Sequence, residues 1–243
     1  MNKALADQTI ALSSAQSGGH DEYTGILLEG KGDLSAAVIL FHGRKQHPDG
    51  DVVGPLRRSL NRIGYTTLSI QAPVPKLSDE FGDYVEDIKG KNYVFPEAYA
   101  RVRTAMKYLK QQLGTQQIVL LGHSMGARMH SAFLAQGERT ELPVRALIAL
   151  SNGVNGIPPL NAALSLKGIC LPVLDVSGEG DPNVAKSLDV RKTAYCGGRG
   201  KDFTGIVING AVPHDFAGFD QDVERCVHAW IATVAPAYAS RSQ

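Results

Sequence analysis

Residues 117–126 read QIVLLGHSMG. The run begins with mostly apolar residues, which is typical of a β-strand buried on both faces of a parallel sheet. It ends in the pattern Gly-x-Ser-x-Gly, and a helical stretch at 125–136 follows almost without a gap. Between a strand and a helix this pattern marks a sharp turn that exposes a serine, and glycines stand where side chains would clash. Ser124 is therefore a candidate nucleophile. The alternative is a glycine-lined helix start without reactivity.

The rest of the chain alternates between strand and helix patterns. Short apolar or alternating runs predict further strands at residues 9–12, 23–29, 36–41, 65–70, 144–150, 171–176 and 203–208. Helices are predicted at residues 52–63, 96–113, 159–166, 183–193 and 223–234. This order predicts right-handed βαβ units and an α/β fold, with a mostly parallel sheet of about seven to eight strands and helices on both faces. Ligands of such sheets bind at the carboxyl ends of the strands.

No linker, repeat or low-complexity tract divides the chain, so residues 1–243 are predicted to form a single domain. Residues 1–22 are predicted to hold an N-terminal strand followed by a polar loop. Residues 71–95 show no clean period and are predicted to form a long irregular loop near the site. The aromatic side chains of that loop are candidates for a pocket wall: Phe81, Tyr84 and Tyr93. The alternative is a surface excursion held together by aromatic packing.

Composition excludes several classes of function. The 243 residues include 25 basic and 24 acidic side chains, for a net charge of +1, so no strong field favours nucleic acid or an anionic membrane. No apolar run reaches the roughly 18 residues of a membrane span, so stable membrane insertion is not expected. Neither a phosphate-binding glycine motif nor a metal-ligand cluster is present. The sequence therefore predicts no cofactor and no metal, and it leaves the oligomeric state open.

The cysteines bear on the compartment. Cys170, Cys196 and Cys226 are too few and too scattered for a disulfide framework or a zinc site. Three reduced thiols in a cytoplasmic protein is the simpler interpretation, and one disulfide with a spare thiol is the alternative. Residues 4–6 read ALA, which resembles the end of a signal peptide, so a periplasmic or secreted location stays open.

A serine nucleophile needs a base to take its proton and an acid to orient that base. At the Gly-x-Ser-x-Gly turn the chain resembles the α/β-hydrolase superfamily of serine hydrolases, and it is similar to a small lidless group of uncharacterised bacterial members. The resemblance covers roughly residues 23–235 and implies the chain order Ser, Asp, His. It implies His214 as the base, directly after the strand that ends near Ile208. His228, the other downstream histidine, lies within the last predicted helix.

The same resemblance implies Asp181 as the acid. This residue lies in a Gly-rich turn just past the strand at 171–176 and is similar to the Gly-x-x-Asp turn of the superfamily. Glu179 is the nearest rival. The alternative role for Asp181 is an N-cap of the helix that begins at Pro182.

Acyl transfer also requires two N–H donors for the developing oxyanion. The resemblance implies the amide of Met125, which follows the nucleophile, and the amide of Arg44 in the turn after the strand at 36–41. Three neighbouring residues are candidates for substrate contact: Gly43, His123 and Tyr84.

Together these residues predict a serine hydrolase that acts on carboxylic esters through a Ser-Asp-His triad and an acyl-enzyme. The predicted partner is a small-molecule ester or thioester. Residues 151–171 are too short for the lid that many superfamily members insert at this point. The alternatives are a thioesterase or amidase on the same triad, or a non-catalytic binding protein with this fold.

Overall fold

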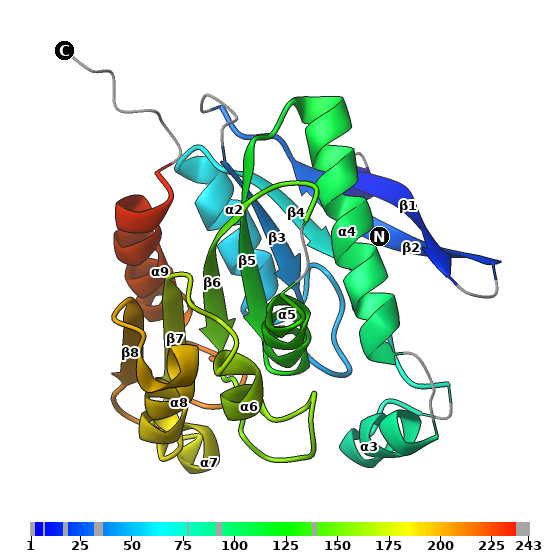
Figure 1. Ribbon diagram of the computed structural model, residues 1–243. Helices are drawn as coiled ribbons and strands as arrows, with labels where there is room; N and C mark the ends of the chain where they lie inside the picture. The colour runs from blue at the N-terminus through cyan, green and yellow to red at the C-terminus, as the bar shows by residue number, and fades with distance from the viewer. Residues whose placement is uncertain are drawn as a thin grey trace.

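The computed structural model describes the chain except for residues 1, 2, 7, 17, 18, 32–35, 77, 91–93, 138, 139 and 237–243. One eight-stranded sheet forms its centre, with the strand order β1-β2-β4-β3-β5-β6-β7-β8 (Figure 1). β1 and β2 are antiparallel, as are β2 and β4, and every other pair is parallel. The strands are β1 (Thr9–Gln16), β2 (Gly19–Leu28), β3 (Ala36–Phe41), β4 (Thr66–Ile70), β5 (Gln117–His123), β6 (Val144–Leu150), β7 (Val173–Gly178) and β8 (Phe203–Ile208).

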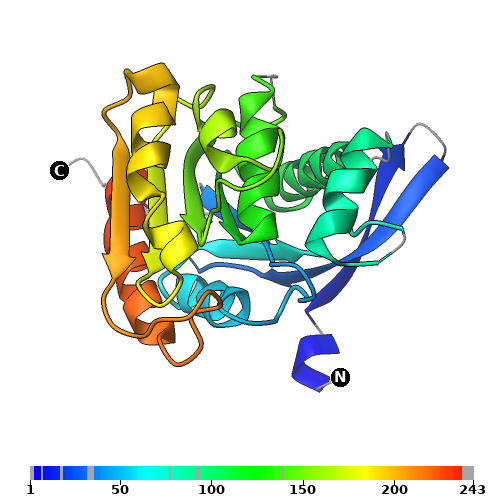
Figure 2. The ribbon, with the colours of Figure 1, turned by 90° about the horizontal axis from the view of Figure 1, so that it is seen from below.

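Helices cover both faces of this sheet (Figure 2). The α-helices are α1 (Lys3–Ala6), α2 (Val53–Arg62), α3 (Phe81–Lys89), α4 (Val94–Leu113), α5 (Met125–Ala135), α6 (Ala162–Leu166), α7 (Pro182–Ala185), α8 (Leu188–Ala194) and α9 (Asp220–Val234). α4, α5, α6 and α8 pack on one face, and α2 and α9 on the other. The predicted α/β architecture is confirmed, and because one continuous sheet runs from β1 to β8, we propose that the chain is one domain.

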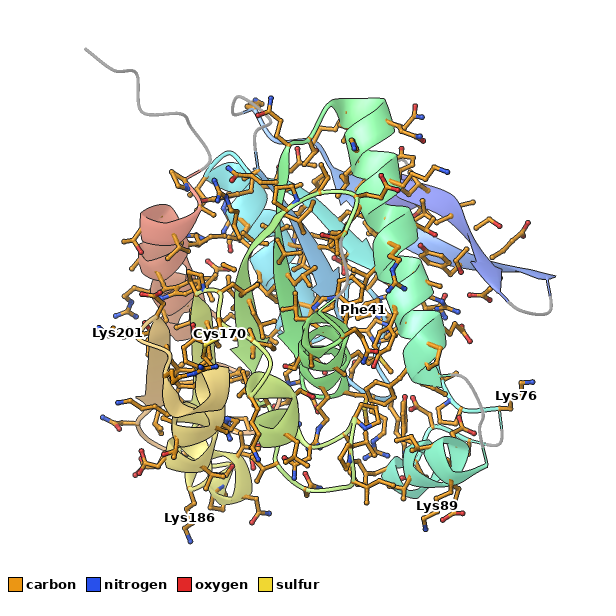
Figure 3. All side chains as sticks on the ribbon, viewed as in Figure 1. Phe41, Lys76, Lys89, Cys170, Lys186 and Lys201 are labelled. Carbon is orange, nitrogen blue, oxygen red and sulfur yellow. A yellow bond between two sulfur atoms is a disulfide. The ribbon has the colours of Figure 1, made fainter. Side chains whose placement is uncertain are left out.

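The sheet separates two apolar cores, which explains the continuous apolar runs of the central strands. All six residues of β3 are buried, and alternate ones point to opposite faces. Ile39 and Phe41 join the core under α4 and α5, whereas Val38 and Leu40 join the core under α2 and α9. Figure 3 shows Phe41 at the end of β3, next to α5. The parallel strands are thereby held with their carboxyl ends at one edge of the molecule.

The predicted polar loop over residues 13–22 is wrong. β1 continues to Gln16 and pairs with β2, which starts at Gly19. Side chains alternate between inside and outside along β1, with Leu12 and Ser14 buried and Ala11 and Ser13 exposed. The serines and glycines hide this alternation in the sequence, and backbone pairing with a neighbouring strand stabilises the hairpin despite its polar composition.

The irregular loop predicted over residues 71–95 is also wrong over much of its length. α3 occupies Phe81–Lys89, and α4 begins at Val94 instead of Pro96. A backbone bond from Glu80 to the Asp83 side chain, 3.2 Å long, stabilises the start of α3. Pro96 falls in the first turn of α4, where a proline costs no helical hydrogen bond. Tyr93 lies outside the described residues.

The interpretation of three reduced thiols is wrong as well. Cys170 and Cys196 form a disulfide, which links the loop before β7 to the turn after α8. Cys226 on α9 is the free thiol and is partly buried. In the described part of the chain, no helix is long and apolar enough to cross a membrane.

A buried ion pair fixes β7 to α8. The Asp175 carboxylate accepts two bonds from the Arg191 guanidinium, at 2.7 Å and 2.8 Å, and both side chains are fully buried. Arg191 also donates to the Ser187 hydroxyl at 2.7 Å and to the Val184 carbonyl at 3.0 Å. Asp175 is therefore a structural residue inside the strand, and it orients the element that ends just before Asp181.

Candidate active site

Ser124 sits in a strained turn between β5 and α5. Its backbone has φ 52° and ψ −113°, a conformation that non-glycine residues rarely adopt. A Cβ at Gly122 would lie 2.5 Å from the Ala127 nitrogen, and one at Gly126 would lie 2.5 Å from the Phe41 carbonyl oxygen. Both glycines are therefore required by close backbone approach, as the Gly-x-Ser-x-Gly pattern predicted.

Replacing Gly126 by alanine is expected to lower the free energy of unfolding by about 1–3 kcal/mol, because the new Cβ overlaps backbone atoms that must shift. Gly82 in α3 provides the matched control, since a Cβ there meets nothing within 4 Å. Gly82→Ala is expected to leave stability unchanged or raise it by up to about 1 kcal/mol. Urea unfolding of both variants is the measurement, and equal effects would contradict the requirement for glycine at the turn.

The structure brings Ser124, His214 and Asp181 together from three different strand ends. Ser124 Oγ lies 2.8 Å from His214 Nε2, and the Asp181 carboxylate is bonded to His214 Nδ1. Because a carboxylate only accepts, Nδ1 carries the proton and Nε2 is left to accept from the serine hydroxyl. The His214 side chain is 48% exposed and that of Asp181 is 12% exposed. This arrangement lets the imidazole take a proton from Ser124 next to open solvent.

Asp181 does not cap a helix, and the alternatives to Asp181 and His214, which are Glu179 and His228, contact other groups. The Asp181 side chain makes no capping bond to α7, although it stands at the N-cap position. Glu179 accepts a bond of 2.6 Å from the Gly210 nitrogen and so stabilises the turn before His214. His228 lies 3.1 Å from Ser59 Oγ, on the face of the sheet covered by α2 and α9.

Two side chains hold the backbone of His214 in place. The His214 carbonyl accepts from Ser151 Oγ at 2.8 Å and from His123 Nε2 at 2.9 Å. Ser151 was not singled out from the sequence, and its place directly after β6 is the signal that points to it. His123 is 2% exposed and does not line the cavity, so its predicted role in substrate contact is replaced by a role in positioning.

The predicted oxyanion residues Arg44 and Met125 both line the cavity next to Ser124. Gly43 lies beneath the serine, since a Cβ on it would be 3.3 Å from Ser124 Cβ and 2.9 Å from His123 Nδ1. The packing therefore leaves no room for a side chain at this position, and Gly43 does not line the cavity. His42 fixes this turn by accepting from the Ala72 nitrogen at 3.0 Å and donating to the Gly43 carbonyl at 2.8 Å.

The cavity has a volume of about 650 Å³. Its lining residues come from the turns after β3, β5, β6, β7 and β8 and from the helices α3, α5 and α7: Arg44, Phe81, Ser124, Met125, Arg128, Gly153, Val154, Asn155, Asp181, Asn183, Val184 and His214. Tyr84 does not line it. That side chain is 2% exposed and donates to Asp79 Oδ1 at 2.8 Å, so it supports the start of α3 from below. The α3 residue that reaches the cavity is Phe81.

The start of α3 is tied to the turn after β3 by charged groups. Arg44 donates to Glu80 at 2.8 Å and to the Asp79 carbonyl at 2.9 Å. Lys45 also pairs with Glu80, and its backbone nitrogen donates to Asp79 Oδ2 at 2.6 Å. The hydrogen bonds from Lys45 and Arg44 lower the pKa of the exposed Glu80 carboxyl. The two cations are thus paired at the rim of the cavity.

Comparison with known proteins identifies the family. A family model described as alpha/beta hydrolase fold matches residues 36–182, which is more than half of the chain. The chain belongs to the α/β-hydrolase fold family. In this chain the segment between β6 and β7 holds only α6, and the described part of the chain has no large cap domain.

Solved structures with the same fold include esterases and hydrolases. Est1E from Butyrivibrio proteoclasticus is 16% identical with a TM-score of 0.67, and the match covers 92% of the present chain and 98% of that chain. The dienelactone hydrolase from Anabaena variabilis is 19% identical with a TM-score of 0.64, over 93% and 98% of the two chains. The Pyrococcus furiosus esterase Pf2001 is 14% identical with a TM-score of 0.68, over 96% and 93%. No curated protein is detectably similar to this chain in sequence.

Three buried histidines around the site make the stability of this protein depend on pH. Burial lowers the pKa of His42 to about 4, of His123 to about 4 and of His130 to about 3. In the unfolded chain each has a pKa of about 6.5, so below that pH the unfolded state takes up protons that the folded state does not. Their contribution is complete above pH ~6.5 and is lost as the pH falls toward the lowered values.

From pH ~6.5 to pH ~5 each of these histidines is expected to lower the free energy of unfolding by about 2 kcal/mol. Urea unfolding at several pH values measures the total loss. The variant His130→Phe removes one titrating ring from the stack with Phe41, whose centroid lies 4.6 Å away. From pH ~6.5 to pH ~5 the free energy of unfolding of His130→Phe should fall by about 2 kcal/mol less than that of the wild type. A pH dependence equal to that of the wild type would contradict the assignment.

Proposed function

We propose that this chain is a serine hydrolase that acts on carboxylic esters through an acyl-enzyme. The observation that carries the proposal is the chain of bonds from Ser124 through His214 to Asp181, at the mouth of a cavity of about 650 Å³. Ser124 has a rarely adopted backbone conformation and lines this cavity. The proposed partner is a small-molecule ester.

The first half of the proposed reaction transfers the acyl group to the enzyme. His214 Nε2 accepts the Ser124 proton while Oγ attacks the carbonyl carbon, and the carbonyl electron pair moves to oxygen. The amides of Arg44 and Met125 donate to this oxyanion. The tetrahedral intermediate collapses, the bond to the alcohol oxygen breaks, and His214 gives its proton to the departing alcohol.

Water completes the cycle. His214 takes a proton from a water molecule while the water oxygen attacks the carbonyl carbon of the acyl-enzyme. His214 then gives this proton to Ser124 Oγ as the carboxylic acid departs. Throughout, Asp181 stays ionised, holds the proton on Nδ1 and stabilises the imidazolium that forms in each half-reaction. The solvent-exposed edge of His214 gives water access to this side of the intermediate.

Asp181→Asn is expected to lower kcat about 10³–10⁴-fold with little change in KM, because the amide no longer holds the imidazole in the correct tautomer. Asp189→Asn, at an exposed position on α8, is the matched control and should keep the wild-type rate. The measurement is steady-state hydrolysis of a neutral short-chain ester. A rate within tenfold of the wild type in Asp181→Asn would remove this residue from the proposed triad.

A panel of substrates with one acyl group tests the reaction class. Wild-type protein is assayed against the ethyl ester, the ethyl thioester and the N-ethyl amide of butyric acid. The proposal expects ester hydrolysis with the highest kcat/KM. Turnover of only the thioester or only the amide would replace the ester with that class, and turnover of none would favour a binding protein with a hydrolase fold.

A further inference from the structure

Arg128 is a buried cation in the wall of the candidate active site. It lies one turn after the nucleophile on α5, where its backbone nitrogen donates to the Ser124 carbonyl at 3.2 Å. The residue is 7% exposed and lines the same cavity as Ser124 and His214. Gly153 makes room for its guanidinium, because a Cβ there would lie 2.1 Å from Nη2. Nothing in the proposed acyl transfer requires this side chain.

Among the described residues, the Arg128 side chain donates hydrogen bonds only to neutral oxygens. Nη1 donates to the carbonyls of Asn155, at 2.7 Å, and Leu160, at 2.6 Å, and Nη2 donates to the Asn155 side chain. The guanidinium carbon also lies 5.3 Å from the centre of the Phe81 ring. Burial lowers the pKa of this guanidinium to about 10, which still leaves it charged at neutral pH.

The other buried arginines are different, because each pairs with a carboxylate. Arg57 contacts Asp49 at 2.7 Å, Arg101 contacts Asp21 at 2.8 Å, and Arg191 contacts Asp175 at 2.7 Å. A buried cation is costly unless an anion compensates its charge. No carboxylate among the described residues lies within ion-pair distance of Arg128.

The charges of the cavity wall do not supply that compensation. Among the described lining residues, Asp181 is the only carboxylate, and it is bonded to His214. The second lining cation, Arg44, is already paired with Glu80. An uncompensated positive charge therefore remains within the cavity, on the wall formed by α5.

We propose that Arg128 selects esters that carry a carboxylate apart from the ester group, as a half-ester of a dicarboxylic acid does. This inference rests on the proposed esterase function and names the substrate class of that same site. A carboxylate is the anion that a planar guanidinium binds in a matched, charge-assisted geometry. Binding such a substrate would give Arg128 the compensating charge that the other buried arginines have within the chain.

The competing role for Arg128 is to hold the segment 153–160 through its carbonyls. Loss of that role would weaken the hydrolysis of charged and neutral esters alike. Recognition of a carboxylate instead affects only the charged member of a matched pair. The ratio of kcat/KM between two esters of similar size therefore separates the two roles.

The experiment compares monoethyl glutarate, which carries the extra charge in its acyl group, with the neutral ester ethyl hexanoate. O-butyrylglycolate and isobutyl butyrate form a second pair, with the charge in the alcohol. Wild-type protein is expected to prefer the acidic member of at least one pair by about 10–100-fold, and Arg128→Gln to lose that preference. Arg128→Lys should retain part of it. Arg145→Gln, at an exposed site on β6, is the control and should behave as the wild type.

The outcomes separate this inference from the function on which it rests. If the wild type shows no preference in either pair, or if Arg128→Gln keeps the wild-type ratio, carboxylate selection is overturned while the esterase stands. If the wild type hydrolyses none of the four esters and a fluorophosphonate fails to label Ser124, the esterase itself is overturned. Labelling of Ser124 in Arg128→Gln shows that this variant is folded and that its triad is assembled.

Discussion

Ser124→Ala is expected to lower kcat for ester hydrolysis by about 10⁶-fold while the protein stays folded, because no other group replaces the attacking oxygen. Thermal unfolding of the variant checks the fold. Ser13→Ala, at an exposed position on β1, is the matched control and should retain the wild-type rate. Retention of more than about one per cent of wild-type kcat in Ser124→Ala would show that the reaction does not pass through this serine.

His214→Ala should lower kcat by a similar factor, and the double variant should be no slower than either single one. The serine and its base act as a unit, so removing the second partner after the first has little further effect. If the double variant lost kcat by the product of the two single losses, Ser124 and His214 would act independently. That result would contradict a catalytic role for the 2.8 Å hydrogen bond between them.

Asp175→Asn is expected to lower the free energy of unfolding by about 3–5 kcal/mol, because the fully buried Arg191 would lose the carboxylate that compensates its charge. Urea unfolding measures the loss. Replacing both partners, as in Asp175→Leu with Arg191→Met, should recover most of it, since no unpaired charge then remains in the core. A loss below about 1 kcal/mol in Asp175→Asn would contradict the structural role of the pair.

The fold and the triad geometry were accessible from the sequence for a physical reason. Parallel strands buried on both faces leave continuous apolar runs such as that of β3, and the site follows where these runs end. Ser124 follows β5 directly, Asp181 lies three residues after the end of β7, and His214 lies six residues after the end of β8. Their spatial convergence follows from the common edge of the sheet, and the resemblance to the α/β-hydrolase superfamily implied which residues at that edge belong together.

Other features of the structure were predicted from the sequence only in part or not at all. The β1–β2 hairpin is stabilised by backbone pairing, and its serines do not mark a strand. α3 depends on contacts of Glu80 with Arg44 and Lys45, which lie more than thirty positions away. The disulfide requires Cys170 and Cys196 to meet, and spacing alone does not specify that. Arg128 resembles any helix-surface cation until its burial is known.

The most direct test of the account is intact-mass spectrometry after incubation with a fluorophosphonate, followed by peptide mapping. The account predicts one adduct on the wild type, located at Ser124, and none on Ser124→Ala. It also predicts slower labelling of Asp181→Asn, because the bond from His214 Nδ1 orients the base. Folded wild-type protein that takes up no label, or a label that persists in Ser124→Ala, would contradict an activated serine at this site.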